Sequence, residues 1–121
     1  DQPEHDAPGW YRAESDEAIG ATIRLIHEQP SYEWTVAELA AQAGMSRAAY
    51  ARHFNEVVGE PPMTYLTNWR LTLAADLLRE PDATVGGVAE EVGYATPFGL
   101  SAAFKRVRGV SPTEYRRAVL A

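Results

Sequence analysis

Cysteine is absent from the 121 residues, which excludes disulfide bridges, thiolate zinc sites and cysteine nucleophiles. No apolar run approaches the roughly 20 residues that a membrane-spanning helix needs, and no secretory signal opens the chain. Signals for β-strands are scarce too, because no alternating run and no Asn-Gly or Asp-Gly hairpin turn occurs. We therefore expect an all-α, cytoplasmic protein with no membrane partner.

Positive charge is also in short supply. The chain has 11 Lys and Arg against 17 Asp and Glu, for a net charge of −6, and this balance by itself argues against a nucleic-acid partner. The charges are unevenly placed, however: residues 1–17 hold six acidic residues and one arginine, whereas residues 101–117 hold five basic residues and one glutamate. The acidity is thus concentrated in the N-terminal tail, and basic charge collects near the other end.

The first 14 residues differ from the rest, since they contain Pro3, Pro8 and Gly9 and show no periodicity. The chain also lacks an initial methionine, so we expect it to be cut from a longer protein, with residues 1–14 as an acidic tail or linker from a missing upstream domain. The remaining sequence predicts a first helix-turn-helix subdomain over 15–60, a linker helix over 61–80 and a second subdomain over 81–121.

Apolar residues recur at helical spacing in almost all of this remainder. Ser15 is the expected N-cap of the first helix, and Leu66, Trp69, Leu73 and Leu77 mark the inward face of a long helix that Pro81 ends. Caps, prolines and glycines set the other boundaries. They predict about seven helices, over residues 15–28, 35–44, 46–59, 62–80, 84–93, 96–109 and from 111 onward.

Residues 35–65 recur in residues 84–115, first at a spacing of 49 and then of 50. Each copy has a short helix, a glycine turn, a longer helix, a second glycine and a proline, which is the pattern of a helix-turn-helix unit. The long helix between the copies would span roughly 28 Å, close to the 34 Å or so of a B-DNA turn. The repeat therefore predicts one chain that reads two adjacent major grooves. The matched pairs are Thr35/Thr84, Val36/Val85, Ala40/Ala89, Gly44/Gly93, Phe54/Phe104, Gly59/Gly109, Pro62/Pro112 and Tyr65/Tyr115.

The longer helix of the first copy has a polar outward face. With Tyr50, Phe54 and Val57 inward, Arg52 is suited to bidentate contact with guanine and Asn55 to contact with a base or phosphate, while small alanines allow close approach to thymine methyl groups. Taken alone, Arg52 is equally well explained as a solvated surface charge. The candidate DNA-binding residues of this helix are Arg47, Ala48, Ala51, Arg52 and Asn55.

The longer helix of the second copy carries fewer groups that can donate hydrogen bonds to bases. Ala102 stands at the position of Arg52, and Lys105, Arg106 and Arg108 are better placed for phosphates. Phe98 is predicted either to contact a thymine methyl or to be an ordinary core aromatic. The first copy should therefore supply most of the sequence specificity. The candidates of this helix are Pro97, Phe98, Ser101, Ala102, Lys105 and Arg106.

Taken together, these motifs resemble the AraC/XylS family of bacterial transcription regulators over about residues 17–118. The resemblance implies seven helices in two subdomains joined by a long helix, promoter binding, and usually activation through RNA polymerase. It places base-reading surfaces on Arg47, Ala48 and Arg52, and on Pro97, Phe98, Ser101 and Ala102. The family usually has Arg at 102 and Phe at 100, where this chain has Ala and Leu. The most specific motifs are Val92-Gly93-Tyr94, Phe104-Lys105-Arg106, Gly109-Val110-Ser111-Pro112 and Tyr115-Arg116.

An enzyme is the competing class, and no motif supports it. The histidines His5, His27 and His53 are far apart, and Ser31 stands where a zinc-binding H-E-x-x-H pattern starting at His27 needs histidine. We expect His53 to pack rather than to ligate, and no catalytic residue, metal or cofactor. A small-molecule effector would act only through the missing upstream domain. A protein-interaction module with weak DNA binding remains the alternative, because of the low basic charge and Ala102.

Overall fold

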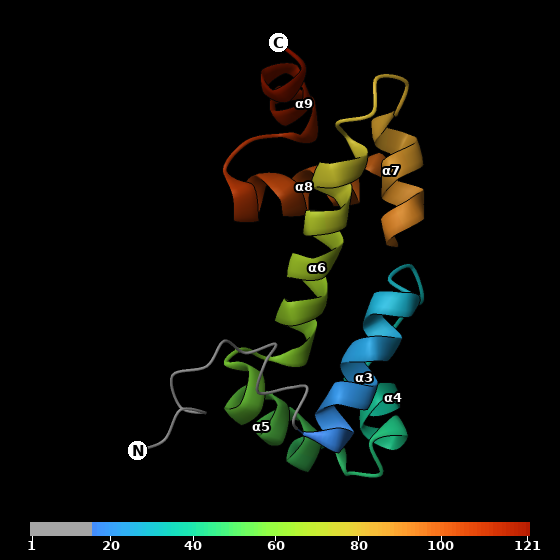
Figure 1. Cartoon of the computed structure of the whole chain (residues 1–121), viewed down its shortest axis with the longest axis vertical. Coiled ribbons are helices and arrows are strands. Elements are labelled where there is room, and N and C mark those ends of the chain that lie inside the picture. Colours follow the sequence, from blue (N-terminus) through green and yellow to red (C-terminus); the bar gives the residue numbers. More distant parts are fainter. Residues whose placement is uncertain (1–15) are drawn as a thin grey trace. The chain divides into compact units, whose positions relative to one another are not determined.

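A computed structural model describes residues 16–121 of the chain, and these residues form helices with no strand among them (Figure 1). The predicted all-α class is therefore confirmed. None of the helices in this range is long and apolar enough to cross a membrane. The seven helices are α3 (Glu17–Glu28), α4 (Val36–Gln42), α5 (Arg47–Val58), α6 (Pro62–Leu77), α7 (Val85–Val92), α8 (Pro97–Arg108) and α9 (Pro112–Leu120).

Side-chain caps start five of the helices at the residues that the sequence predicts. The side-chain oxygen of each cap accepts a hydrogen bond from the backbone N–H three residues later, which satisfies one of the amides that a helix start leaves without a partner. The first helix is capped by Asp16, whose Oδ1 accepts from the amide of Ile19 at 3.0 Å. Ser15, the predicted cap, lies outside the described residues. The predicted caps that are confirmed are Thr35, Ser46, Thr84, Thr96 and Ser111.

The chain divides into two compact units, and the division falls within α6, between Leu66 and Thr67. In its described part, unit 1 comprises residues 16–29 and 34–66, and unit 2 comprises residues 30–33 and 67–121. Unit 1 buries Ile19, Ile23, Ile26, Leu39, Ala40, Tyr50, Phe54 and Leu66. Unit 2 has a separate core of Leu71, Ala74, Ala75, Leu78, Val88, Ala89, Val92, Leu100, Ala103 and Phe104.

Helix α6 departs from the prediction in which of its residues are most deeply buried and in where it ends. Of the residues predicted to face inward, Leu66 is buried, and Leu73 and Leu77 are partly buried and pack against the unit 2 core. Trp69 is also only partly buried. The fully buried α6 residues of that core are Leu71, Ala74 and Ala75. Because apolar residues lie on all sides of α6, spacing alone does not fix its inward face. The helix also ends at Leu77 rather than near residue 80: the following turn is tightened by bonds between residues three apart, from Arg79 N to Asp76 O and from Glu80 N to Leu77 O.

Candidate nucleic-acid interface

Each unit contains a short helix, a glycine turn and a longer helix, built from the two copies of the sequence repeat. After Gly44 the amide of Met45 donates to the carbonyl of Ala40 at 2.9 Å, and after Gly93 the amide of Tyr94 donates to the carbonyl of Ala89 at 2.8 Å. Gly44 and Gly93 have φ of 71° and 104°, the left-handed conformation that favours glycine. The two turns are thus equivalent, except that the second is one residue longer, as the shift in repeat spacing predicted.

The inward faces of α5 and α8 are fixed by equivalent contacts. Phe54 and Phe104 are both completely buried, as predicted. The Phe54 ring packs against Tyr65 with centroids 5.9 Å apart, and the Phe104 ring packs against Tyr115 at 5.5 Å. These contacts set the rotation of each helix about its own axis, so they decide which residues point away from the core.

Helix α5 presents a polar outward face. Ala48, Arg52 and Asn55 are exposed and follow each other at i, i+4 and i+7, so they form one row along the helix, which we call the α5 stripe. Arg47 is exposed beside the start of the stripe, and Ala51 is half-buried at its edge. The structure thus brings all five sequence-predicted residues of this helix to one side, with Arg52 as the middle residue of the α5 stripe.

Helix α8 presents a different row at the matched positions. Phe98, Ala102 and Lys105 are exposed at i, i+4 and i+7 and form the α8 stripe. Phe98 is 86% exposed, so its interpretation as a core aromatic is wrong. The inward positions of this helix are already occupied by Leu100, Ala103 and Phe104. The other predicted residues flank the stripe, with Pro97 and Arg106 exposed and Ser101 half-buried.

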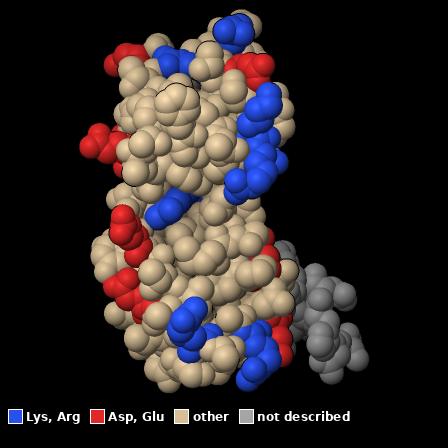
Figure 2. Space-filling model, turned by 180° about the vertical axis from the view of Figure 1, so that it is seen from behind, with Lys and Arg blue, Asp and Glu red and all other residues tan. Residues whose placement is uncertain are grey.

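Basic side chains gather in the second half of α8. Lys105, Arg106 and Arg108 lie in its last turn and are exposed. Figure 2 shows a strip of Lys and Arg side chains along one edge of unit 2, while acidic side chains lie mostly toward the opposite edge. Arg108 also donates to Thr72 Oγ1 at 3.1 Å and lies over the Phe104 ring, 5.9 Å from its centroid. The end of α8 is therefore suited to contact an anionic partner.

Two arginines hold loops of unit 2, a role that the sequence did not indicate. Arg116 donates to the backbone carbonyls of Glu80, Pro81 and Ala83 and so fixes the loop between α6 and α7. It counts toward the basic charge of residues 101–117, but its guanidinium binds the chain's own backbone. Because the acceptors are carbonyls at least 33 residues away, no pattern of residue types could have revealed them.

Arg70 binds backbone in the same manner. Its Nε donates to the carbonyl of Pro30 and its Nη2 to that of Tyr32, both at 2.8 Å, and its Cζ lies 5.9 Å from the ring centroid of Tyr94. Burial lowers the pKa of Arg70 from its usual value, while Tyr94 and Glu33 oppose that change. Arg70 therefore fixes residues 30–33 beside the glycine turn that precedes α8.

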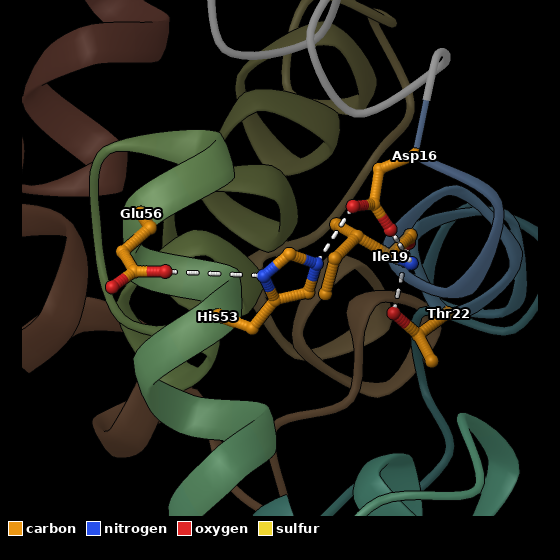
Figure 3. A network of polar contacts seen from close by, with 5 residues as sticks. All are labelled: Asp16, Ile19, Thr22, His53 and Glu56. Carbon is orange, nitrogen blue, oxygen red and sulfur yellow. Dashed lines mark hydrogen bonds and ion pairs between the residues drawn. The ribbon is translucent and has the colours of Figure 1, made fainter.

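In unit 1, polar contacts tie α5 to α3 (Figure 3). His53 Nε2 lies 2.6 Å from Oδ2 of Asp16, the residue that caps α3, and His53 Nδ1 lies 3.9 Å from Glu56 Oε1. In the buried interior the hydroxyl of Tyr50 donates to Thr22 Oγ1 at 3.0 Å. His53 thus anchors the helix that carries the α5 stripe. The described residues contain no group of three or more His, Asp or Glu side chains that could hold a metal ion.

Comparisons with known proteins identify relatives of this arrangement. A family model described as a helix-turn-helix domain matches residues 39–118. A protein of Streptomyces lividans described as an AraC-like transcription regulator is 42% identical over 113 residues, which cover 93% of this chain and 37% of that protein. RclR of Escherichia coli, an RCS-specific HTH-type transcriptional activator, is 42% identical over 101 residues, which cover 84% of this chain and 36% of RclR. The chain thus spans little more than a third of the length of these relatives.

A solved structure supports the same relationship. It is the DNA-binding domain of AdpA, a global transcriptional factor, in complex with a target DNA. Its TM-score is 0.78 at 33% identity, and the match covers 82% of this chain and 89% of that chain. The predicted architecture of two helix-turn-helix subdomains is confirmed by this similarity.

Proposed function

The chain belongs to the AraC/XylS family of DNA-binding transcription regulators, and we propose that it is the promoter-binding part of a bacterial regulator, with α5 and α8 as its recognition helices. The observation that carries the proposal is the equivalence of these two helices. Each is held by a buried phenylalanine and turns a row of exposed side chains away from the core. A helix held in this way can enter a major groove without disturbing its own packing.

The exposed residues of α5 and α8 suggest different roles for the two helices in DNA binding. Arg52 has the fork geometry for the O6 and N7 of guanine, and Asn55 can reach a base or phosphate. Lys105 and Arg106 supply charge for phosphates. We expect Arg47, Ala48 and Ala51 to complete the surface of α5, and Pro97, Phe98, Ser101 and Ala102 that of α8.

We further propose that one chain engages two adjacent major grooves of one promoter. Helix α6 joins the two helix-turn-helix segments, and its 16 residues measure roughly 24 Å along the axis, against about 34 Å for a turn of B-DNA. The name of RclR describes an activator, which favours activation, through contact with RNA polymerase. A small-molecule effector would act through an upstream domain, and the site of action would be the cytoplasm, where bacterial promoters lie.

A protein-interaction module with weak DNA binding is the second candidate. Two observations favour it: the net charge of −6 and the alanine at position 102 of α8. Such a module would use the same exposed stripes against a protein surface. The two candidates predict different dependences on salt, because only phosphate contacts release counterions from a duplex.

The deciding experiment measures binding of the 121-residue chain to its own promoter region by fluorescence anisotropy, at several salt concentrations. A shuffled duplex of the same composition is the control. We expect tighter binding to the promoter at every salt concentration, with the affinity for both duplexes falling steeply as salt rises. Equal affinity for the two duplexes, or an affinity that salt does not change, would favour the interaction module.

A further inference from the structure

We propose that unit 2 recognises 5-methylated pyrimidines, thymine or 5-methylcytosine, through apolar contact with Phe98 and Ala102 rather than through hydrogen bonds. This inference rests on the proposed function, because it requires α8 to lie in a major groove. The C5 position of a pyrimidine faces that groove, and the thymine methyl is the apolar group that base edges present there.

The first observation is the environment of Phe98. Phe98 is 86% exposed, although it belongs to a well-anchored helix start. Thr96 accepts from the amide of Gly99 at 3.0 Å, and a Cβ atom on Gly99 would already lie 3.4 Å from Tyr94 Cδ1. The backbone under Phe98 is therefore fixed, and the ring projects into solvent from a rigid base. Burial of such a ring against an apolar group of a partner is favourable.

The second observation is the chemistry around the ring. Pro97 has no backbone N–H, and Phe98 and Ala102 have no polar side-chain atom, so the exposed start of α8 offers bases mainly the half-buried hydroxyl of Ser101. One turn after Ala102, Lys105 places an ammonium on the same row. A partner that suits this row is apolar at one end and anionic at the other, which describes a methyl-bearing base edge and its phosphate backbone.

The two stripes differ by an exchange of long and short side chains. In α5 the first position is Ala48 and the second is Arg52, whereas in α8 the first is Phe98 and the second is Ala102. The side chain that can reach a base is thus polar and one turn into α5, but apolar and at the start of α8. The exchange favours hydrogen-bond recognition by unit 1 and methyl recognition by unit 2.

The test replaces thymine by deoxyuridine, which removes the C5 methyl and leaves every hydrogen-bonding group in place. A duplex that the 121-residue chain binds tightly is first selected from a random library. Each thymine on both strands is then replaced in turn, and the dissociation constant is measured for the unaltered chain, for Phe98→Ala and for Arg52→Ala. In a variant duplex, cytosine at the responsive position is compared with 5-methylcytosine.

We expect one or two thymines whose replacement weakens binding about fourfold, the value for one buried methyl-sized group. Phe98→Ala should abolish this difference, whereas Arg52→Ala should keep it, and methylation of the cytosine should restore a similar factor. Phe98→Leu, which keeps an apolar side chain, should retain part of the effect.

Two results would overturn the inference alone: a selected duplex indifferent to every deoxyuridine, or the same response in Phe98→Ala as in the unaltered chain. Failure to select any preferred duplex would instead refute the proposed function, and methyl recognition with it. Because Phe98 is exposed, its substitution should leave the melting temperature unchanged, so a loss of binding cannot be ascribed to unfolding.

Discussion

Gly93 and Arg70 lie so close together in unit 2 that a Cβ atom on the glycine would be 2.9 Å from the guanidinium carbon of Arg70. The same Cβ would also lie 2.9 Å from the Cα of Ser31, in the segment that Arg70 holds. The equivalent residue of unit 1, Gly44, has nothing within 4 Å of its Cβ position. The two glycine turns are alike in conformation but not in their surroundings.

Gly44→Ala and Gly93→Ala should therefore differ in cost. Both place an L-residue at positive φ, which costs about 1–2 kcal/mol. Gly93→Ala must in addition push Arg70 away from the carbonyls of Pro30 and Tyr32, so we expect it to lower the free energy of unfolding by at least about 1 kcal/mol more. Urea denaturation of the two variants measures the difference. If both variants lost the same free energy of unfolding, Arg70 would be able to move away from an alanine at position 93 without destabilising unit 2.

Replacement of the buried phenylalanines should destabilise both units. Phe54→Ala and Phe104→Ala each remove a ring from a closed core, and such changes cost about 3–5 kcal/mol. The matched control is Phe98→Ala, where the ring is exposed and the expected change is within about 0.5 kcal/mol. Chemical denaturation followed by circular dichroism provides the comparison. If Phe54→Ala melted like the unaltered chain, the inward face assigned to α5 would be wrong.

Arg52→Ala should weaken binding to the operator by about 1–3 kcal/mol and relax the preference at one base pair. Binding to random DNA should change much less, since a base contact contributes little there. Arg24→Ala, which removes an exposed arginine from α3, is the control for loss of charge alone. Competition titrations with operator and random duplexes give both affinities. Equal weakening on the two would make Arg52 a phosphate contact.

The two halves of the operator should carry unequal sequence information. Arg47 and Arg52 of α5 stand where α8 has Pro97 and Ala102, so the second helix lacks both guanidinium groups. A saturation scan of the operator should show losses of about 1–3 kcal/mol per base pair under α5. The losses under α8 should be smaller, except at a thymine that meets Phe98. Equal or greater information in the second half would contradict this assignment.

In the same assay, Lys105→Ala tests whether Lys105 contacts a phosphate group or a base. We expect weaker binding to all duplexes and a salt slope that is flatter by about one unit, as loss of one phosphate contact predicts. An effect confined to one sequence would mean that Lys105 contacts a base.

Protonation of His27 should contribute to the pH dependence of the free energy of unfolding. Its ring stacks on Tyr65 with centroids 5.9 Å apart, its Nε2 lies 2.7 Å from the Tyr65 hydroxyl, and partial burial lowers the pKa of His27 below the usual 6.5. The unfolded chain therefore binds this proton more readily than the folded one, and stability falls as the pH drops below about 6.5. His27→Gln, which keeps a polar group at this position, should lose less stability between pH 7.5 and 5. If the free energy of unfolding changed with pH in the same way in the unaltered chain and in His27→Gln, His27 would not be the source of the loss of stability at low pH.

Local features were predictable from the sequence because their causes lie within a few residues. A threonine or serine that caps a helix acts on the amide three residues later, and a glycine at positive φ ends a helix by its own backbone conformation. Because the same pattern of caps, glycines and apolar residues occurs in both copies of the repeat, Phe54 and Phe104 could be identified as core residues from their matched positions. The rows of exposed residues on α5 and α8 follow from those two anchors.

Features that depend on distant segments could not be predicted. The inward face of α6 depends on which elements pack against it, and its apolar residues allow several choices. Arg70 and Arg116 look like surface charges in the sequence, because their partners are backbone carbonyls far along the chain. The exposure of Phe98 was equally undecided until Leu100, Ala103 and Phe104 were seen to fill the inward side of its helix.

The hydrogen-bonded caps of the described helices bear on how the chain folds. Six of these helices begin at a Ser, Thr or Asp whose side chain binds an amide three residues later. Their limits are thus specified before remote segments meet, and helical chains rich in local contacts fold within about microseconds to milliseconds. A molecule that opens transiently can regain both cores rapidly, which shortens the time its apolar segments are available to proteases and to aggregation.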